Sequence, residues 1–96
     1  MRIHLFFPES GSLKGKRAEL NRVKALLRER LRTSVAEVGH QDSWQRSTLA
    51  VAIAARSVGL AEETVNTVQR ALDNRFPQGV RVEYRLASWD DLESVG

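Results

Sequence analysis

Two hydrophobic periods alternate along the chain, and their order predicts its fold. Residues 47–55 alternate large apolar side chains with small ones, as a strand inside a sheet does. A period of two over residues 1–8, 34–40 and 80–89 predicts three more strands. Apolar residues spaced by three and four predict amphipathic helices over residues 16–32 and 60–76. The predicted order is therefore β-α-β-β-α-β.

This order predicts a single α+β domain, a ferredoxin-like sandwich. Right-handed crossovers place four antiparallel strands in the order 4-1-3-2, with both helices on one face. The first and third strands then lie in the middle of the sheet, and the more polar second strand lies at an edge. The 96 residues allow one such domain. Residues 90–96 are predicted to form a frayed acidic tail.

Each predicted helix turns one apolar stripe toward the sheet. On the first helix the stripe consists of Leu20, Val23, Leu27 and Leu31. On the second it consists of Ala61, Val65, Val68, Leu72 and Phe76. These stripes predict the helix contribution to the core.

The predicted topology brings two polar segments to the same end of the molecule. The first two strands run in the same direction, so the loop 9–15 and the turn 41–46 both lie at that end. We therefore expect Lys14, Lys16 and Arg17 to lie beside the turn and to form a cationic rim with it. Trp44 would stack on a partner, while Gln41, Gln45 and Arg46 would donate hydrogen bonds. Alternatively, Trp44 folds back over the helices and Arg46 pairs with Asp42.

The positive charge is concentrated in one segment. The net charge is +3, but residues 14–32 hold eight basic and two acidic residues, a local net charge of +6. Arg17, Lys24, Arg28 and Arg32 form a stripe along the flank of the first helix. Such a field attracts polyanions. In the alternative interpretation the stripe is a solvated helix face, whose last cations suit the helix dipole.

Several classes of chemistry find no support in the sequence. Without cysteine the chain has neither disulfides nor thiolate metal sites, which favours a reducing compartment. His4 and His40 lack the spacing of metal ligands, and Ser10 and Ser12 lack a base in register. Acylphosphatases share the predicted fold, but they need an asparagine near the third strand, where this chain has Gln45, Ser47 and Thr48. We therefore expect no catalytic residue, cofactor or metal.

The open face of the predicted sheet carries few aromatic side chains. The third strand offers Ala50, Ala52 and Ala54 there, and the first strand offers His4 and Phe6. This does not predict the base-stacking platform of an RRM domain. A flat alanine-rich face favours close packing of a second copy, which would form a homodimer. No apolar run has the length of a membrane span and no secretory signal is recognisable, so we expect a cytoplasmic protein.

Two segments resemble a known family. These are LKGKR at residues 13–17 and SVAEVGHQDSWQRSTLAVA at residues 34–52. The chain resembles the YlxP-like proteins, small conserved bacterial proteins of unknown function, over essentially its full length. The resemblance implies a ferredoxin-like fold. It also implies an RNA- or ribosome-linked role, through a gene neighbourhood shared with translation initiation and ribosome-maturation factors. No catalytic residues are established for the family, so the resemblance assigns none to this chain.

We therefore expect a non-enzymatic accessory factor that binds structured RNA or a ribosomal particle. The candidate RNA- or anion-binding residues are Lys14, Lys16, Arg17, Lys24, Arg28, Arg32, Gln41, Trp44, Gln45 and Arg46. The alternative is a homodimeric protein-interaction module or small-anion-binding module, with the alanine-rich face as interface and residues 13–17 as ligand site.

Overall fold

The computed structural model describes residues 1–77 and 79–90. Its elements are β1 (Arg2–Phe6), α1 (Leu13–Ala25), the π-helical turn η1 (Leu26–Arg30), β2 (Ser34–Gly39), β3 (Arg46–Ala52), α2 (Val58–Arg75) and β4 (Val80–Glu83). The predicted element order is confirmed. Residues 91–96 of the predicted acidic tail lie outside the described residues.

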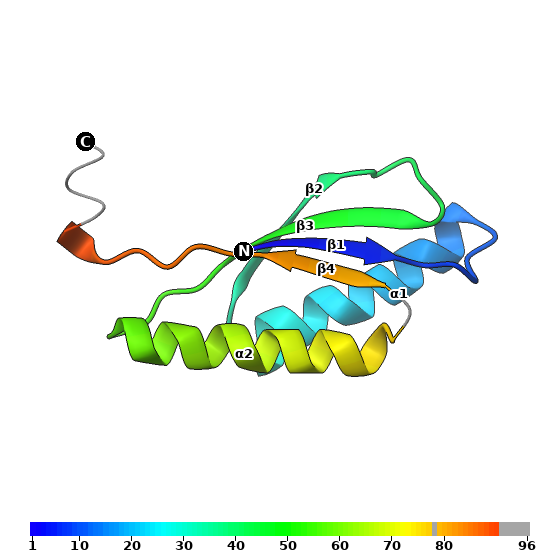
Figure 1. The fold of residues 1–96 in the computed structure, drawn as a ribbon. Coiled ribbons are helices and arrows are strands. Elements are labelled where there is room, and N and C mark those ends of the chain that lie inside the picture. The colour runs from blue at the N-terminus through cyan, green and yellow to red at the C-terminus, as the bar shows by residue number, and fades with distance from the viewer. Residues whose placement is uncertain (78, 91–96) are drawn as a thin grey trace.

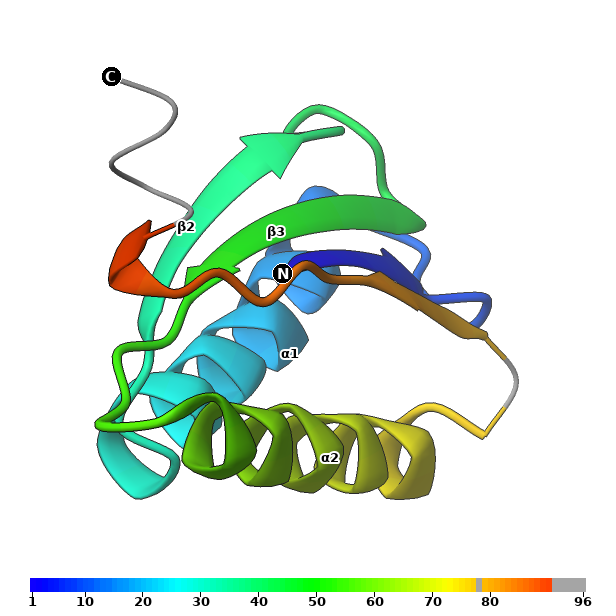
Figure 2. The same ribbon diagram turned by 60° about the vertical axis from the view of Figure 1, so that its left-hand side comes forward.

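The four strands form one antiparallel sheet in the order β2-β3-β1-β4. This is the predicted order 4-1-3-2 counted from the other edge. Both helices lie on the same face of the sheet, and no described element covers the opposite face (Figures 1 and 2). The ferredoxin-like α+β fold is therefore confirmed, with β1 and β3 in the middle.

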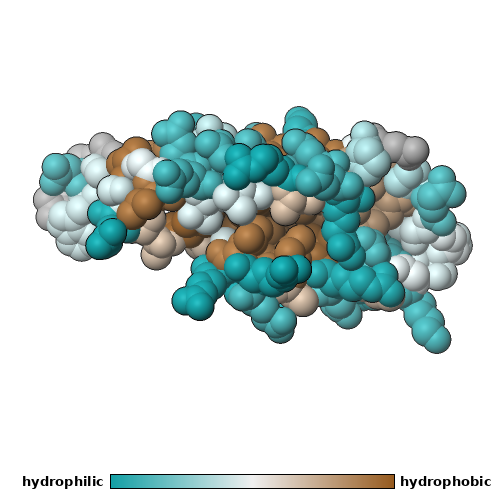
Figure 3. All heavy atoms as spheres, turned by 90° about the horizontal axis from the view of Figure 1, so that it is seen from below, coloured by the Kyte–Doolittle hydropathy of each residue, from teal (hydrophilic) through white to brown (hydrophobic). Residues whose placement is uncertain are grey.

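The core lies between the sheet and the helix pair. From the central strands it takes Ile3, Leu5, Leu49 and Val51, each at most 3% exposed. The predicted stripes of both helices are buried there too, except that Leu31 packs at the margin and Ala61 is only half-buried. Around this core the helix side of the molecule is ringed by hydrophilic side chains, which surround a smaller hydrophobic area (Figure 3).

Two strands are shorter than their hydrophobic alternation predicts. β3 ends at Ala52 rather than at residue 55, and β4 ends at Glu83 rather than at residue 89. The cause is the start of β1, where Arg2 pairs with both Ala50 and Glu83. Met1 still exchanges two hydrogen bonds with Val51, and β2 pairs with β3 as far as Ala52. A strand continues only while a neighbour supplies hydrogen bonds, so β3 ends with its last β2 partner and β4 with its last β1 partner.

Helix α1 begins three residues earlier than predicted. Ser12 is its N-cap, and its hydroxyl oxygen accepts a hydrogen bond from the Gly15 N–H at 3.0 Å. At the other end the chain passes through η1 and turns at Arg32, whose φ is 54°. Lys14 therefore belongs to the first helical turn together with Lys16, not to the preceding loop.

Candidate functional site

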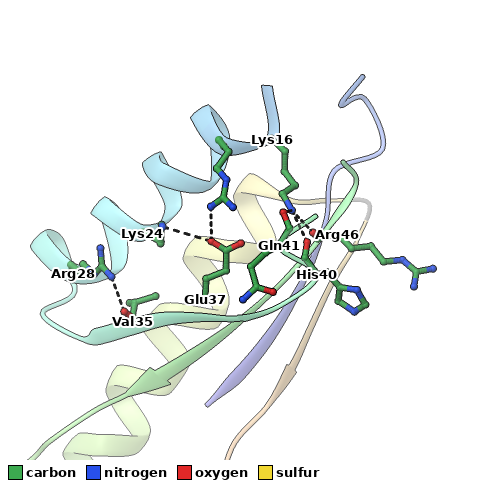
Figure 4. Close-up of polar contacts among 9 residues, drawn as sticks. Lys16, Lys24, Arg28, Val35, Glu37, His40, Gln41 and Arg46 are labelled. Atoms are coloured by element: carbon green, nitrogen blue, oxygen red, sulfur yellow. Dashed lines mark hydrogen bonds and ion pairs between the residues drawn. The ribbon is translucent and has the colours of Figure 1, made fainter. Parts of the chain in front are cut away.

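Lys16 fastens the first turn of α1 to the β2–β3 hairpin. Its Nζ donates to the carbonyl oxygens of His40 at 2.7 Å and Arg46 at 2.9 Å, and lies 3.4 Å from that of Gln41 (Figure 4). The residue is 0% exposed. The predicted juxtaposition of the helix entry and the hairpin is thus confirmed, and Lys16 itself creates it.

The expectation that Lys16 contacts RNA is wrong, because its ammonium is buried and donates its hydrogen bonds to backbone carbonyl groups of the hairpin. Residue 16 precedes Leu20 by four positions, so it lies on the core stripe of α1. Burial lowers the pKa of Lys16, and the nearby carboxylate of Glu37 opposes this effect. The three N–H groups of a lysine ammonium match the three carbonyl oxygens around it.

The hairpin itself has a defined backbone. His40 takes a left-handed conformation with φ of 60°, which histidine tolerates better than most residues. The Ser43 hydroxyl oxygen then accepts from the N–H groups of Gln45 at 3.3 Å and Arg46 at 3.2 Å. The side-chain amide of Gln45 donates to the Pro8 carbonyl at 3.3 Å, so it ties the hairpin to the end of β1.

The predicted site residues of the hairpin are exposed. Trp44 is 55% exposed, so it does not fold back over the helices. Within the described residues Arg46 makes no ion pair, and the alternative pairing with Asp42 is absent. Gln41 is exposed as well.

The basic stripe of α1 lies along the edge strand β2. Arg17 Nη1 lies 3.0 Å from Glu37 Oε2, and Lys24 Nζ lies 3.9 Å from the same oxygen (Figure 4). Arg28 Nη2 donates to the Val35 carbonyl at 2.7 Å. Three of the four stripe residues therefore hold the helix against the strand. Glu37 partly neutralises Arg17 and Lys24.

Sequence reasoning missed Glu37, although its signal was present. Glu37 follows Val35 by two positions on β2, and residues two positions apart on a strand share a face, so both lie on the helix-facing side. Its side chain is 10% exposed, and its Oε1 is buried with no hydrogen-bond partner among the described residues. Because a single carboxylate faces both Arg17 and Lys24, the net charge of this flank stays positive.

The remaining predicted residues separate into two places. Lys14 is exposed on the same flank of α1, at the hairpin end. Arg32 is exposed at the opposite end of the helical segment, after η1. The hairpin end of the molecule thus carries the exposed side chains of Lys14 and Arg17 on α1 and of Trp44 and Arg46 on the hairpin, that of Arg46 extending away from α1. We call these four residues the hairpin rim.

On the open face of the sheet His4 bridges two neighbouring strands. Its Nε2 lies 2.7 Å from Glu83 Oε1, and its Nδ1 lies 3.3 Å from Thr48 Oγ1. This hydrogen bond from His4 lowers the pKa of Glu83. An ionised carboxylate only accepts, so Nε2 donates to it, and in the neutral ring Nδ1 accepts from Thr48. His4 is therefore held by hydrogen bonds to both strands that flank β1.

We expect His4→Phe to raise the pKa of Glu83, since the ring then offers no N–H. In the wild type the folded-state pKa of Glu83 lies below its ordinary value of 4.5. The contact therefore stabilises the protein above that value, and this contribution is lost as the pH falls through the folded-state pKa. NMR titration of the Glu83 carboxyl carbon in both proteins measures the difference. Identical midpoints would contradict the assignment.

Taken together, fold and site define a small ferredoxin-like α+β domain with a cationic rim at one end. The chain belongs to the family described as "Protein of unknown function (DUF503)", whose model matches residues 1–85. It is 34% identical over 70 residues to the uncharacterized protein YlxP of Bacillus subtilis (strain 168), covering 73% of this chain and 75% of that protein. The resemblance to the YlxP-like family is thereby confirmed.

Two observations on residues 1–77 and 79–90 complete the description of the site. Neither described helix is both long enough and apolar enough to cross a membrane. In the same part of the chain no three histidine, aspartate or glutamate side chains come together as metal ligands.

Proposed function

We propose that the protein is a non-enzymatic cytoplasmic accessory factor that binds structured RNA, either ribosomal RNA or a ribosomal particle. The observation that supports this most is the hairpin rim, where an exposed tryptophan shares one end of the molecule with three cations. Of these, Lys14 and Arg46 make no ion pair among the described residues. Such a combination suits RNA, because unpaired bases stack on aromatic rings and phosphates attract arginine and lysine.

Lys16 contributes to this proposal through rigidity. Because its ammonium holds the carbonyl groups of His40 and Arg46, the hairpin needs little further ordering when a ligand binds. Preorganised surfaces lose less conformational entropy on association. Trp44 is thus presented to a partner by a backbone that is already held in place.

The flank of α1 would extend the rim as a row of phosphate contacts. Arg17 and Lys24 share Glu37, whereas Lys14 and Arg32 make no ion pair among the described residues. We therefore expect the hairpin end to contribute more binding energy than the middle of the flank. Arg28 would contribute through the part of its guanidinium that does not face Val35.

Titration of a structured ribosomal RNA fragment at increasing salt tests the proposal. Each phosphate contact is expected to make the slope of log affinity against log salt more negative by about 0.7–0.9. Four contacts predict a slope of about −3. A companion measurement asks whether the protein co-sediments with ribosomal subunits from its host, with and without ribonuclease. An affinity independent of salt, or no binding at all, would contradict the proposal.

A second candidate function is self-association through the alanine-rich part of the open face. The register pairs Ala36 with Ala50 and Ser34 with Ala52, which leaves a patch of small side chains beside the edge strand. Small residues allow close approach of a second sheet. As a small-anion module, the protein would instead use N–H groups at the start of α1, of which Gly15 already donates to Ser12.

For this candidate we expect Ala52→Arg to halve the mass measured by light scattering, because the arginine would separate the two faces. The wild-type mass should then be insensitive to salt. A wild-type protein that is monomeric throughout the accessible concentration range would contradict self-association.

A further inference from the structure

The open face of the sheet contains a hollow at the hairpin end. Its volume is about 400 Å³, and it is lined by side chains or backbone from β1, β3, β4 and the end of β2. The polar and aromatic side chains of its lining include His4, Phe6, His40, Arg46, Thr48 and Arg81. Ligand pockets occupy roughly 300–1,000 Å³, so the hollow has the size of a small ligand site.

The charges around this hollow favour an anionic group. Arg46 has no ion-pair partner within the described residues, and Arg81 reaches Glu83 only at 4.0 Å. Glu83 is also held by His4 at 2.7 Å. Two arginines therefore line the hollow, and Glu83 is the one carboxylate among the described residues that pairs with either of them. A second copy docked here by two-fold symmetry would place these arginines against one another, which is unfavourable.

An aromatic ring completes the site. Phe6 is 40% exposed and stands directly opposite Arg46 in the β1–β3 register. Gly79 lets the chain pass close to this ring, since a Cβ there would lie 3.3 Å from Phe6 Cβ. Thr48 and Glu83 hold the neighbouring imidazole of His4 from both sides, so its ring cannot turn freely. The lining thus combines a stacking surface with two cations.

We propose that this hollow binds one unpaired nucleotide of the bound RNA, with the base stacked on Phe6 and a phosphate contacted by Arg46 and Arg81. This inference rests on the proposed RNA binding and specifies the form of RNA. Arg46 connects the two surfaces: its carbonyl oxygen accepts from Lys16, while its side chain and that of His40 extend away from α1 (Figure 4).

The proposed site differs from the base-stacking platform of an RRM domain in the number of bases that it can hold. Such a platform stacks two or three bases on aromatics of two strands. Here the open side of β3 presents Thr48, Ala50 and Ala52, so β1 supplies the ring. One base and one phosphate are what the lining accommodates. Sequence reasoning did not find the site, because Arg81 and Gly79 join it only through the pairing of β4 with β1.

A matched pair of RNAs tests the inference. One is a blunt hairpin, and the other is the same hairpin with a short unpaired 3′ extension that carries 2-aminopurine. We expect the wild type to bind the extended RNA about tenfold more tightly, as stacking of one base provides. The fluorescence of 2-aminopurine should be quenched on binding. Phe6→Leu should abolish both the preference and the quenching, while leaving the affinity for the blunt hairpin unchanged.

Arg81→Gln is a second variant, at a side chain that is 73% exposed and outside the hairpin rim. We expect it to reduce the preference for the extended RNA several-fold. If circular dichroism shows that Phe6→Leu does not fold, Arg81→Gln alone tests whether the hollow binds the nucleotide. Arg56→Gln, an exposed arginine beyond the far end of β3, is the control and should change neither RNA affinity.

The possible failures are distinguishable. Equal affinity of the wild type for both RNAs, without quenching, overturns the nucleotide site and leaves RNA binding intact. A parallel loss of affinity for both RNAs in Phe6→Leu and Arg81→Gln also overturns it, because the face would then act only through general contact. If neither RNA binds the wild type, the proposed function and this inference both fall.

Discussion

Lys16→Met is expected to lower the free energy of unfolding by about 2–3 kcal/mol, because it leaves buried carbonyl groups without a donor. The ammonium serves the carbonyl oxygens of His40 and Arg46 at 2.7 and 2.9 Å. Each orphaned polar group costs on the order of 1–3 kcal/mol. Removing a desolvated charge offsets part of this loss. For a domain of this size the melting temperature should fall by roughly 10–20 °C.

Thermal and urea unfolding measure this change, and Lys14→Met is the matched control. It makes the same substitution two residues earlier, at an exposed side chain. We expect it to change stability by no more than about 0.5 kcal/mol. Amide exchange in the hairpin should also accelerate in Lys16→Met, since α1 no longer holds the turn. Equal stabilities of the two variants would show that Lys16 does not fasten the hairpin.

The double variant Lys14→Ala with Arg46→Ala is expected to lower RNA affinity about 20-fold at 0.15 M salt, if each residue makes one phosphate contact. The slope of log affinity against log salt should become shallower by about 1.5. Both side chains are exposed and free of ion pairs within the described residues, so their removal leaves no buried charge behind. Filter binding or fluorescence anisotropy over a salt series measures both quantities.

Arg56→Ala with Arg85→Ala removes the same charge from the other end of the sheet. Arg56 follows β3 and Arg85 follows β4, and both strands end far from the hairpin. We expect this pair to change affinity about twofold or less and to leave the slope unaltered. A loss equal to that of the first pair would mean that RNA responds to net charge alone, which contradicts a localised rim.

The candidate site was only partly predictable. The position of the rim followed from topology, because two strands that run in the same direction deliver the helix entry and the hairpin to one end. The role of Lys16 did not follow, although its place on the core stripe four residues before Leu20 was visible. A lysine on that stripe is acceptable only where carbonyl groups surround it, and these come from residues 24 and 30 positions further along the chain.

The amino-acid sequence alone determined the number, type and order of the elements and the stripes that form the core. It could do so because hydrophobic periodicity is a local property of consecutive residues. Only the tertiary structure decided where β3 and β4 end, that Glu37 meets Arg17 and Lys24, and which arginines surround Phe6. Each of these depends on hydrogen bonds or ion pairs between segments distant in sequence, and such partners are set by strand register and helix docking.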